Sequence, residues 1–206
     1  MAKAQAQHAA TVGVAEHGNS AVLVTVGPGG EILDRRRIDL TRDLPTHPYH
    51  HEGSWAVGRY TNSPWARAIS LPDAVALVER VRESAARGAR ESLERLASAV
   101  PMLIESIAIR VCPKLPATTI ERIKDTRAAN VADSVMYREA LATAAESRGW
   151  SVRWYDRERV FQQAAAALGG KDVDAFLNAM GKSIGPPWQA KHKLAAAATL
   201  AARALK

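Results

Sequence analysis

The chain has 206 residues, a formal net charge of +7 and a single cysteine. Because one cysteine can neither close an internal disulfide nor supply a cysteine-rich zinc site, secreted disulfide scaffolds and zinc fingers of that type are excluded. The apolar run at 194–202 is shorter than the roughly 20 residues of a membrane span, and residues 1–10 lack the apolar centre of a signal peptide, so we expect a cytoplasmic protein with no membrane partner.

Two short apolar segments, at residues 11–15 and 21–26, are followed by an alternating segment at 31–40. Turn-forming Gly, Asn, Ser and Pro residues separate them. The third segment alternates, which places Ile32 and Ile38 on one face and arginines on the other. This pattern predicts a three-stranded antiparallel meander whose charged third strand lies at an edge of the sheet.

Residues 41–69 differ in composition from the segments on either side. They contain three prolines, three of the six histidines and two of the five tryptophans. Long loops in compact proteins are usually functional or disordered, and the aromatic residues argue against disorder. We interpret 41–69 as an irregular insertion within a single domain spanning residues 11–206, and we expect residues 1–10 to be disordered.

Helices and strands alternate after this insertion. The pattern predicts a helix opened by Ser70, a strand at 104–111, a helix from Thr118 to about 148, a strand at 151–155, and helices at 157–168, about 172–181 and from about 188. Helical crossovers should make the later strands parallel to the first, with right-handed connections.

This order of elements resembles the ribonuclease H-like fold, which is shared by ribonuclease H, Holliday-junction resolvases and transposases. The resemblance spans residues 11–204, and its best local match is residues 12–20, where Glu16 stands at the family's acidic position after the first strand. It implies an α/β fold with a mixed five-stranded sheet and helices on both faces. It also implies a phosphodiester hydrolase in which several carboxylates hold two divalent cations, Mg²⁺ or Mn²⁺.

The chain departs from the family at the other carboxylate positions. Residues 111–113 read Val-Cys-Pro where a second carboxylate is expected, and residues 191–193 read Lys-His-Lys where a third is expected. Two main hypotheses therefore stay open: a divergent metal-dependent nuclease, and a non-catalytic module of the same fold that binds nucleic acid or protein. A nucleotide-handling enzyme of the related ATPase branch is a third.

The candidate catalytic residues come from three parts of the chain. Glu16 and His17 follow the first strand, Asp133 lies on a polar stripe of the central helix, and His192 is in the final helix. A carboxylate would hold the metal ion, and a histidine with a pKa near the working pH would act as general base on a water molecule. Imidazole and carboxylate groups can also ligate a metal, and the candidate ligands are Glu16, His50, His51 and Glu52.

Arginines interleaved with aromatic residues suit contacts with phosphates and bases. The candidate nucleic-acid-binding residues are Arg35 and Arg37 on the predicted edge strand, and Arg59 and Arg67 in the insertion. Nucleic acid is the expected partner, and a homodimer is an option that the sequence leaves open.

Overall fold

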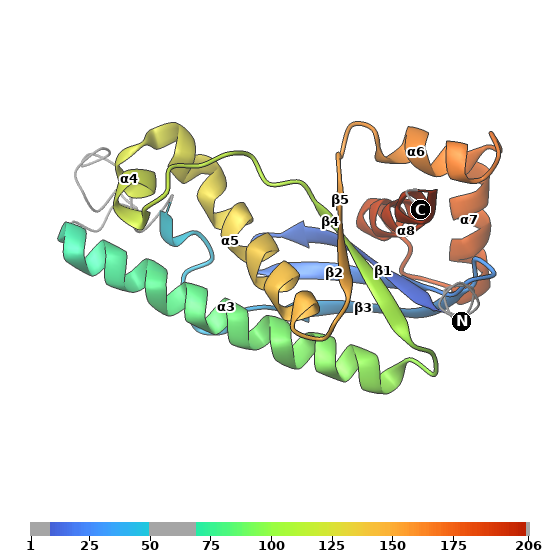
Figure 1. The fold of residues 1–206 in the computed structure, drawn as a ribbon, viewed down its shortest axis with the longest axis horizontal. Helices are drawn as coiled ribbons and strands as arrows, with labels where there is room; N and C mark the ends of the chain where they lie inside the picture. Colours follow the sequence, from blue (N-terminus) through green and yellow to red (C-terminus); the bar gives the residue numbers. More distant parts are fainter. Residues whose placement is uncertain (1–8, 50–68, 205–206) are drawn as a thin grey trace.

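A computed structural model of the chain describes residues 9–49 and 69–204, and in it a mixed five-stranded sheet has the strand order β3-β2-β1-β4-β5 (Figure 1). The antiparallel meander comprises β1 (Ala10–His17), β2 (Ser20–Val26) and β3 (Ile32–Asp39). β4 (Ile104–Arg110) pairs in parallel with β1, and β5 (Ser151–Tyr155) pairs in parallel with β4. The predicted topology is confirmed, including β3 at the edge.

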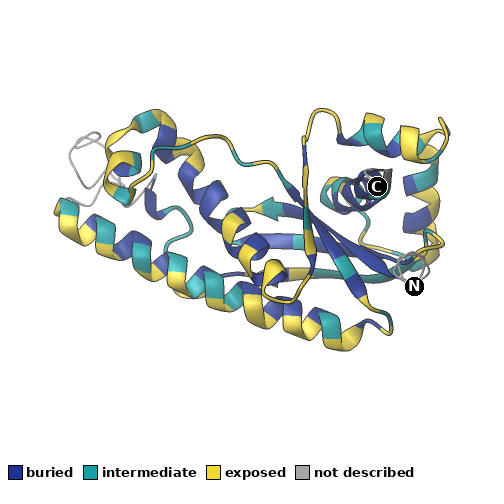
Figure 2. Ribbon diagram, in the orientation of Figure 1, coloured by how far each residue is buried: buried dark blue, intermediate teal, exposed yellow. Residues whose placement is uncertain are grey.

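Helices cover both faces of this sheet (Figure 1). The elements on one face are α3 (Leu71–Ala99), α4 (Thr119–Lys124) and α5 (Thr126–Glu146), and those on the other are α6 (Val160–Ala167), α7 (Val173–Ile184) and α8 (Ala190–Ala204). Each side has its own apolar cluster, and Figure 2 shows the central strands and α8 as buried while the outer side of α3 is exposed. In the described ranges, no helix combines the length and apolar character needed to span a membrane.

The expectation that Ile32 shares a face with Ile38 is wrong. Thr25 pairs with Asp34 but the next residue, Val26, pairs with Ile32, so β3 carries one extra residue at this point. Side chains alternate with a period of two, and the extra residue moves everything before it to the opposite face. Ile38 accordingly packs in the cluster beneath α3, whereas Ile32 packs on the α8 side.

The predicted helix from Thr118 to about 148 is in fact two helices. Its predicted start at Thr118 is confirmed by a capping box, in which Thr118 and Glu121 are hydrogen-bonded reciprocally. At Asp125 the backbone is extended, with φ −96° and ψ 114°, and one carboxylate oxygen accepts hydrogen bonds from the N–H groups of Arg127 and Ala128. Asp125 is therefore the N-cap of α5, which explains the break.

Close packing against β1 fixes the position of α8. A Cβ atom at Gly13, in the middle of β1, would collide with the carbonyl oxygen of Ala195. The alanines of α8 that face the sheet are fully buried. Small residues on both elements let the two backbones approach, and this places the first turn of α8 beside the end of β1.

Candidate functional site

Glu16 lies near the end of β1, as predicted, but its carboxylate is already paired. Arg138 of α5 donates to the same carboxylate oxygen from Nε at 2.7 Å and from Nη2 at 2.5 Å. The side chains of Glu16 and Arg138 are only 8% and 6% exposed. Arg138 also donates from Nη1 to the carbonyl of Val111 at 3.0 Å, which ties α5 to the end of β4.

This pairing bears on the expected Mg²⁺ or Mn²⁺ site. Hard divalent cations are bound by several oxygen ligands, yet the partner of Glu16 is a guanidinium, which is always positively charged. Among residues 9–49 and 69–204, no three His, Cys, Asp or Glu side chains are grouped as a metal site would require. The described residues around Glu16 therefore do not fit a divalent cation.

The predicted ligands His50, His51 and Glu52 lie outside the described residues, and their metal-binding role stays a prediction. The same holds for Arg59 and Arg67 as nucleic-acid contacts.

Asp133 on α5 holds the described first part of the 41–69 insertion. Its carboxylate is buried and accepts a hydrogen bond from the Tyr49 N–H at 3.0 Å, and its second oxygen lies 3.7 Å from Nδ1 of His47. The hydrogen bond to Asp133 raises the pKa of His47, against the opposing effect of burial. One turn further on, Tyr137 donates to the carbonyl of Thr46 at 2.9 Å. These contacts explain why Asp133 and Tyr137, two polar residues of α5, are buried.

The opposite face of the sheet brings other predicted residues together. A cavity of about 620 Å³ lies between the meander and the first turn of α8. Its walls include His17, Arg35, Arg37 and His192, four residues that the sequence singled out. Glu16 lies on the other face of the sheet with Arg138, so the candidate residues are divided between two faces of the sheet.

His192 is oriented by its own helix terminus. Its Nδ1 accepts a hydrogen bond from the Gln189 N–H at 3.1 Å, and its ring stacks on Trp188 at 5.8 Å between centroids. Burial, and then the charge of Arg35, lowers the pKa of His192. Within the described part of the chain, no hydrogen bond or ion pair joins His192 to Glu16, and the imidazole instead accepts a hydrogen bond at the start of α8.

The two arginines predicted on β3 have different surroundings. Arg35 donates to the carbonyls of Gly185, Pro186 and Pro187 at 2.8, 3.2 and 2.5 Å, which holds the linker between α7 and α8. Arg37 is 71% exposed, and its Nε lies 3.6 Å from Oδ1 of Asp39, which is itself about half exposed. Arg37 is therefore the arginine of the two that is available to a ligand.

Lys191 at the start of α8 lies within reach of the charges of both Arg37 and Arg157, and we call Arg37, Arg157 and Lys191 the cationic edge. Burial, and then the charge of Arg37, lowers the pKa of Lys191; Arg157 acts in the same direction and Glu16 opposes. The sequence analysis missed Arg157. Arg157 follows β5, and the carboxyl ends of parallel strands meet at one edge of a sheet. The predicted topology could therefore have placed Arg157 at the same edge as the end of β1.

Comparison with known proteins identifies the fold. No protein-family model matches the chain, and no curated protein matches its sequence. The structure is similar to that of T. thermophilus RuvC in complex with a Holliday junction substrate, with a TM-score of 0.51 and 15% identity over 94% of this chain and 92% of that one. A second Thermus thermophilus RuvC structure gives a TM-score of 0.45 and 14% identity over 93% and 92% of the two chains. The chain thus has the predicted ribonuclease H-like, RuvC-like fold.

Proposed function

We propose that this chain binds nucleic acid through the cationic edge and does not cleave it by two-metal hydrolysis. This is the non-catalytic alternative that the sequence left open. The observation that carries it is the buried Glu16–Arg138 ion pair at the carboxyl end of β1, within reach of Lys191 of the cationic edge.

Charge and position support nucleic acid as the ligand. The cationic edge gathers residues from β3, from the segment after β5 and from α8, which are far apart in the sequence. Lys and Arg side chains supply most of the affinity of proteins for the phosphate backbone. A protein of similar fold has been solved with a Holliday junction, so a four-way junction is the first ligand to test.

The ion pair supports binding without hydrolysis. Two-metal catalysis needs carboxylates that are free to hold cations on both sides of the reacting phosphate. Freeing Glu16 would leave the Arg138 guanidinium buried without a counter-charge, a state that costs several kcal/mol. The fold is thus kept while its first carboxylate is committed to a structural contact.

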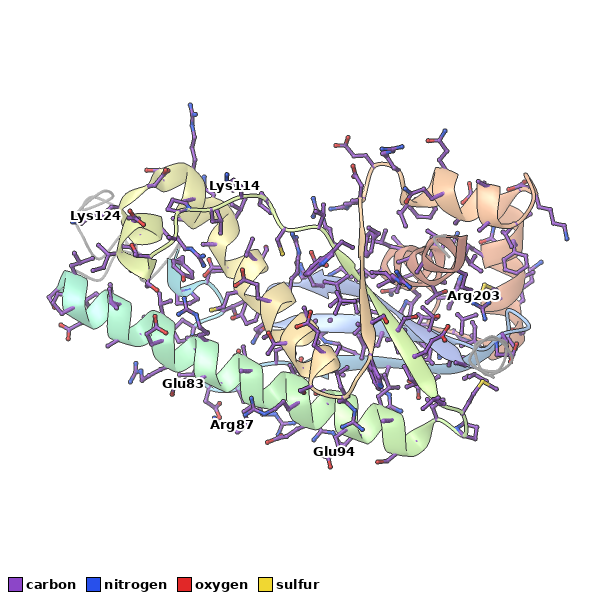
Figure 3. The ribbon with its side chains drawn as sticks, in the orientation of Figure 1. Glu83, Arg87, Glu94, Lys114, Lys124 and Arg203 are labelled. Carbon is purple, nitrogen blue, oxygen red and sulfur yellow. The ribbon has the colours of Figure 1, made fainter. Side chains whose placement is uncertain are left out.

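Fluorescence anisotropy with a labelled four-way junction and a duplex of matched length tests the binding. The double charge reversal Arg37→Glu with Lys191→Glu should weaken binding about tenfold or more, which corresponds to roughly 1.4 kcal/mol. Lys124→Glu is a matched control for single reversals such as Lys191→Glu, because Lys124 lies on α4 at the opposite end of the molecule from α8 (Figure 3). Equal losses for Lys124→Glu and Lys191→Glu would remove the case for a defined cationic edge.

Incubating the same junction with Mg²⁺ or Mn²⁺ tests the second half of the proposal. We expect intact DNA on a denaturing gel. Metal-dependent cleavage by the wild type that is lost in a folded Glu16→Gln variant would instead establish the nuclease hypothesis.

A further inference from the structure

The cavity between the meander and α8 has the size and the chemistry of a ligand site. Its volume of about 620 Å³ falls within the roughly 300–1,000 Å³ of small-molecule pockets. Small apolar groups form much of its wall: Ala15, Ala21, Val22, Pro187 and Ala190.

The formally charged side chains of the described lining, Arg35, Arg36, Arg37 and Lys191, are all cationic. No Asp or Glu is among the described residues that line the cavity. Two of its arginines are engaged by the protein, Arg35 by the linker carbonyls and Arg36 by Asp34. Arg37 and Lys191 remain to face a ligand, with the imidazole of the exposed His17 beside them.

The first turn of α8 adds to this positive potential. The helix begins at Ala190, and the N–H groups of a first helical turn have no partner within the helix. Together with the helix dipole, they favour an anionic group at this end. An apolar wall next to a cationic one matches a molecule with a flat, weakly polar part and an attached phosphate.

We propose that this cavity binds a single nucleotide unit, with its phosphate toward Arg37 and Lys191 and its base against the apolar wall. The inference deepens the proposed function and rests on it where the nucleotide belongs to a polymer. A base inside a duplex is stacked and paired and cannot enter such a pocket. The ligand class is therefore unpaired nucleotides, as found in single strands and at branch points, with free nucleoside monophosphates as the other source of the same chemistry.

Filling the cavity without changing its charge provides the test. Ala190→Trp adds an indole at an exposed lining position at the start of α8, and His17→Ala is a second variant that removes a lining ring at an exposed site. Circular dichroism and urea unfolding check that both variants fold. Anisotropy is then measured with a labelled single strand and with a blunt duplex of the same length, and calorimetry with adenosine and cytidine monophosphates.

Three outcomes are informative. If Ala190→Trp weakens single-strand binding about tenfold and leaves duplex binding within a factor of two, the nucleotide pocket is supported. If the variant changes both affinities equally, or neither, the pocket inference fails while the cationic edge stands. If the wild type binds monophosphates but no polymer, and Ala190→Trp abolishes that binding, the cavity is a free-nucleotide site and the proposed function is wrong.

Discussion

The Glu16–Arg138 pair shows how burial decides what a side chain can do. Both groups are almost fully removed from water, so each depends on the other for compensation of its charge. Removing one partner of such a pair typically costs about 3–5 kcal/mol, because the remaining charge stays buried and unpaired. Replacing both partners with uncharged groups costs much less.

We therefore expect Glu16→Gln to lower the free energy of unfolding by about 3–5 kcal/mol. The double variant Glu16→Gln with Arg138→Met should recover most of that loss, because no unpaired charge remains. Urea unfolding of the wild type, both single variants and the double variant measures the coupling. A Glu16→Gln variant as stable as the wild type would mean that Glu16 is not held by Arg138 in solution.

His47 provides a pH-dependent contribution to stability. Its pKa is raised by the hydrogen bond to Asp133, from a usual value of about 6.5. A histidine whose pKa is higher in the folded state stabilises the fold fully below its unfolded pKa, and this contribution is lost as the pH rises through its folded pKa. The window in which it is lost therefore begins above about pH 6.5.

The stability difference between the wild type and His47→Ala should accordingly be larger at about pH 5.5 than at about pH 8. Urea unfolding at the two pH values measures it, and NMR titration of the ring protons assigns it to His47. His192 offers an internal contrast, because its pKa is lowered by burial and its contribution is lost as the pH falls. A larger difference at the higher pH would reverse the sign and contradict the Asp133 contact.

At the scale of elements, β1 and α8 pack closely against each other. Gly13→Ala adds one methyl group where the Ala195 carbonyl already lies, and the obstacle is backbone, so relief requires α8 to move. Overpacking of this kind costs about 1–3 kcal/mol. Ser151→Thr is the control, since it also adds a methyl group to a strand but at an exposed position. If both substitutions are neutral by thermal unfolding, α8 does not pack this closely.

The elements themselves were largely predictable because their signals are local. Alternation marked the strands, and Ser70 and Thr118 marked two helix starts that the structure confirms. The bulge in β3 was not predictable from alternation, because the shift in pairing at Val26 depends on how the 27–31 turn closes, with Gly27 N–H donating to the Glu31 carbonyl. Local patterns specify an element but not its register against a neighbour.

The candidate site was less predictable for the same reason. The sequence indicates that Glu16 ends a strand and that Arg138 lies on a polar stripe, but only the packing of α5 on the sheet brings the two together. The spacing of Gln189 and His192 is a local signal for the histidine cap, which sequence reasoning could have used. The remaining contacts depend on which face of the sheet a side chain lies on. Glu16 lies on one face, whereas His17 and His192 line the cavity on the other.

At the scale of the whole molecule, the distribution of the +7 charge matters more than its size. On α3, acidic and basic side chains alternate over the outer surface, where Glu83, Arg87 and Glu94 project into solvent (Figure 3). Opposite charges that are interspersed in this way largely cancel at the distance of a bound strand, because screening in physiological salt acts within about 8 Å. The cavity that adjoins the cationic edge has no acidic residue in its described lining, so this surface is suited to a polyanion.

This distribution leads to a prediction about salt. For duplex DNA, the logarithm of the binding constant falls with the logarithm of salt concentration by a slope of about −0.9 for each phosphate neutralised. Three contacts from the cationic edge would contribute about −2.7 to that slope.

Lys191→Gln should make the slope less steep by about 0.9, whereas Lys124→Gln should leave it unchanged. Anisotropy titrations over a series of salt concentrations measure both slopes, and identical slopes for the two variants would show that Lys191 contacts no phosphate. A slope that changes as expected in a protein that leaves the junction uncut would connect the ion pair at Glu16 and the charges at the sheet edge to a single activity, the binding of a phosphate backbone.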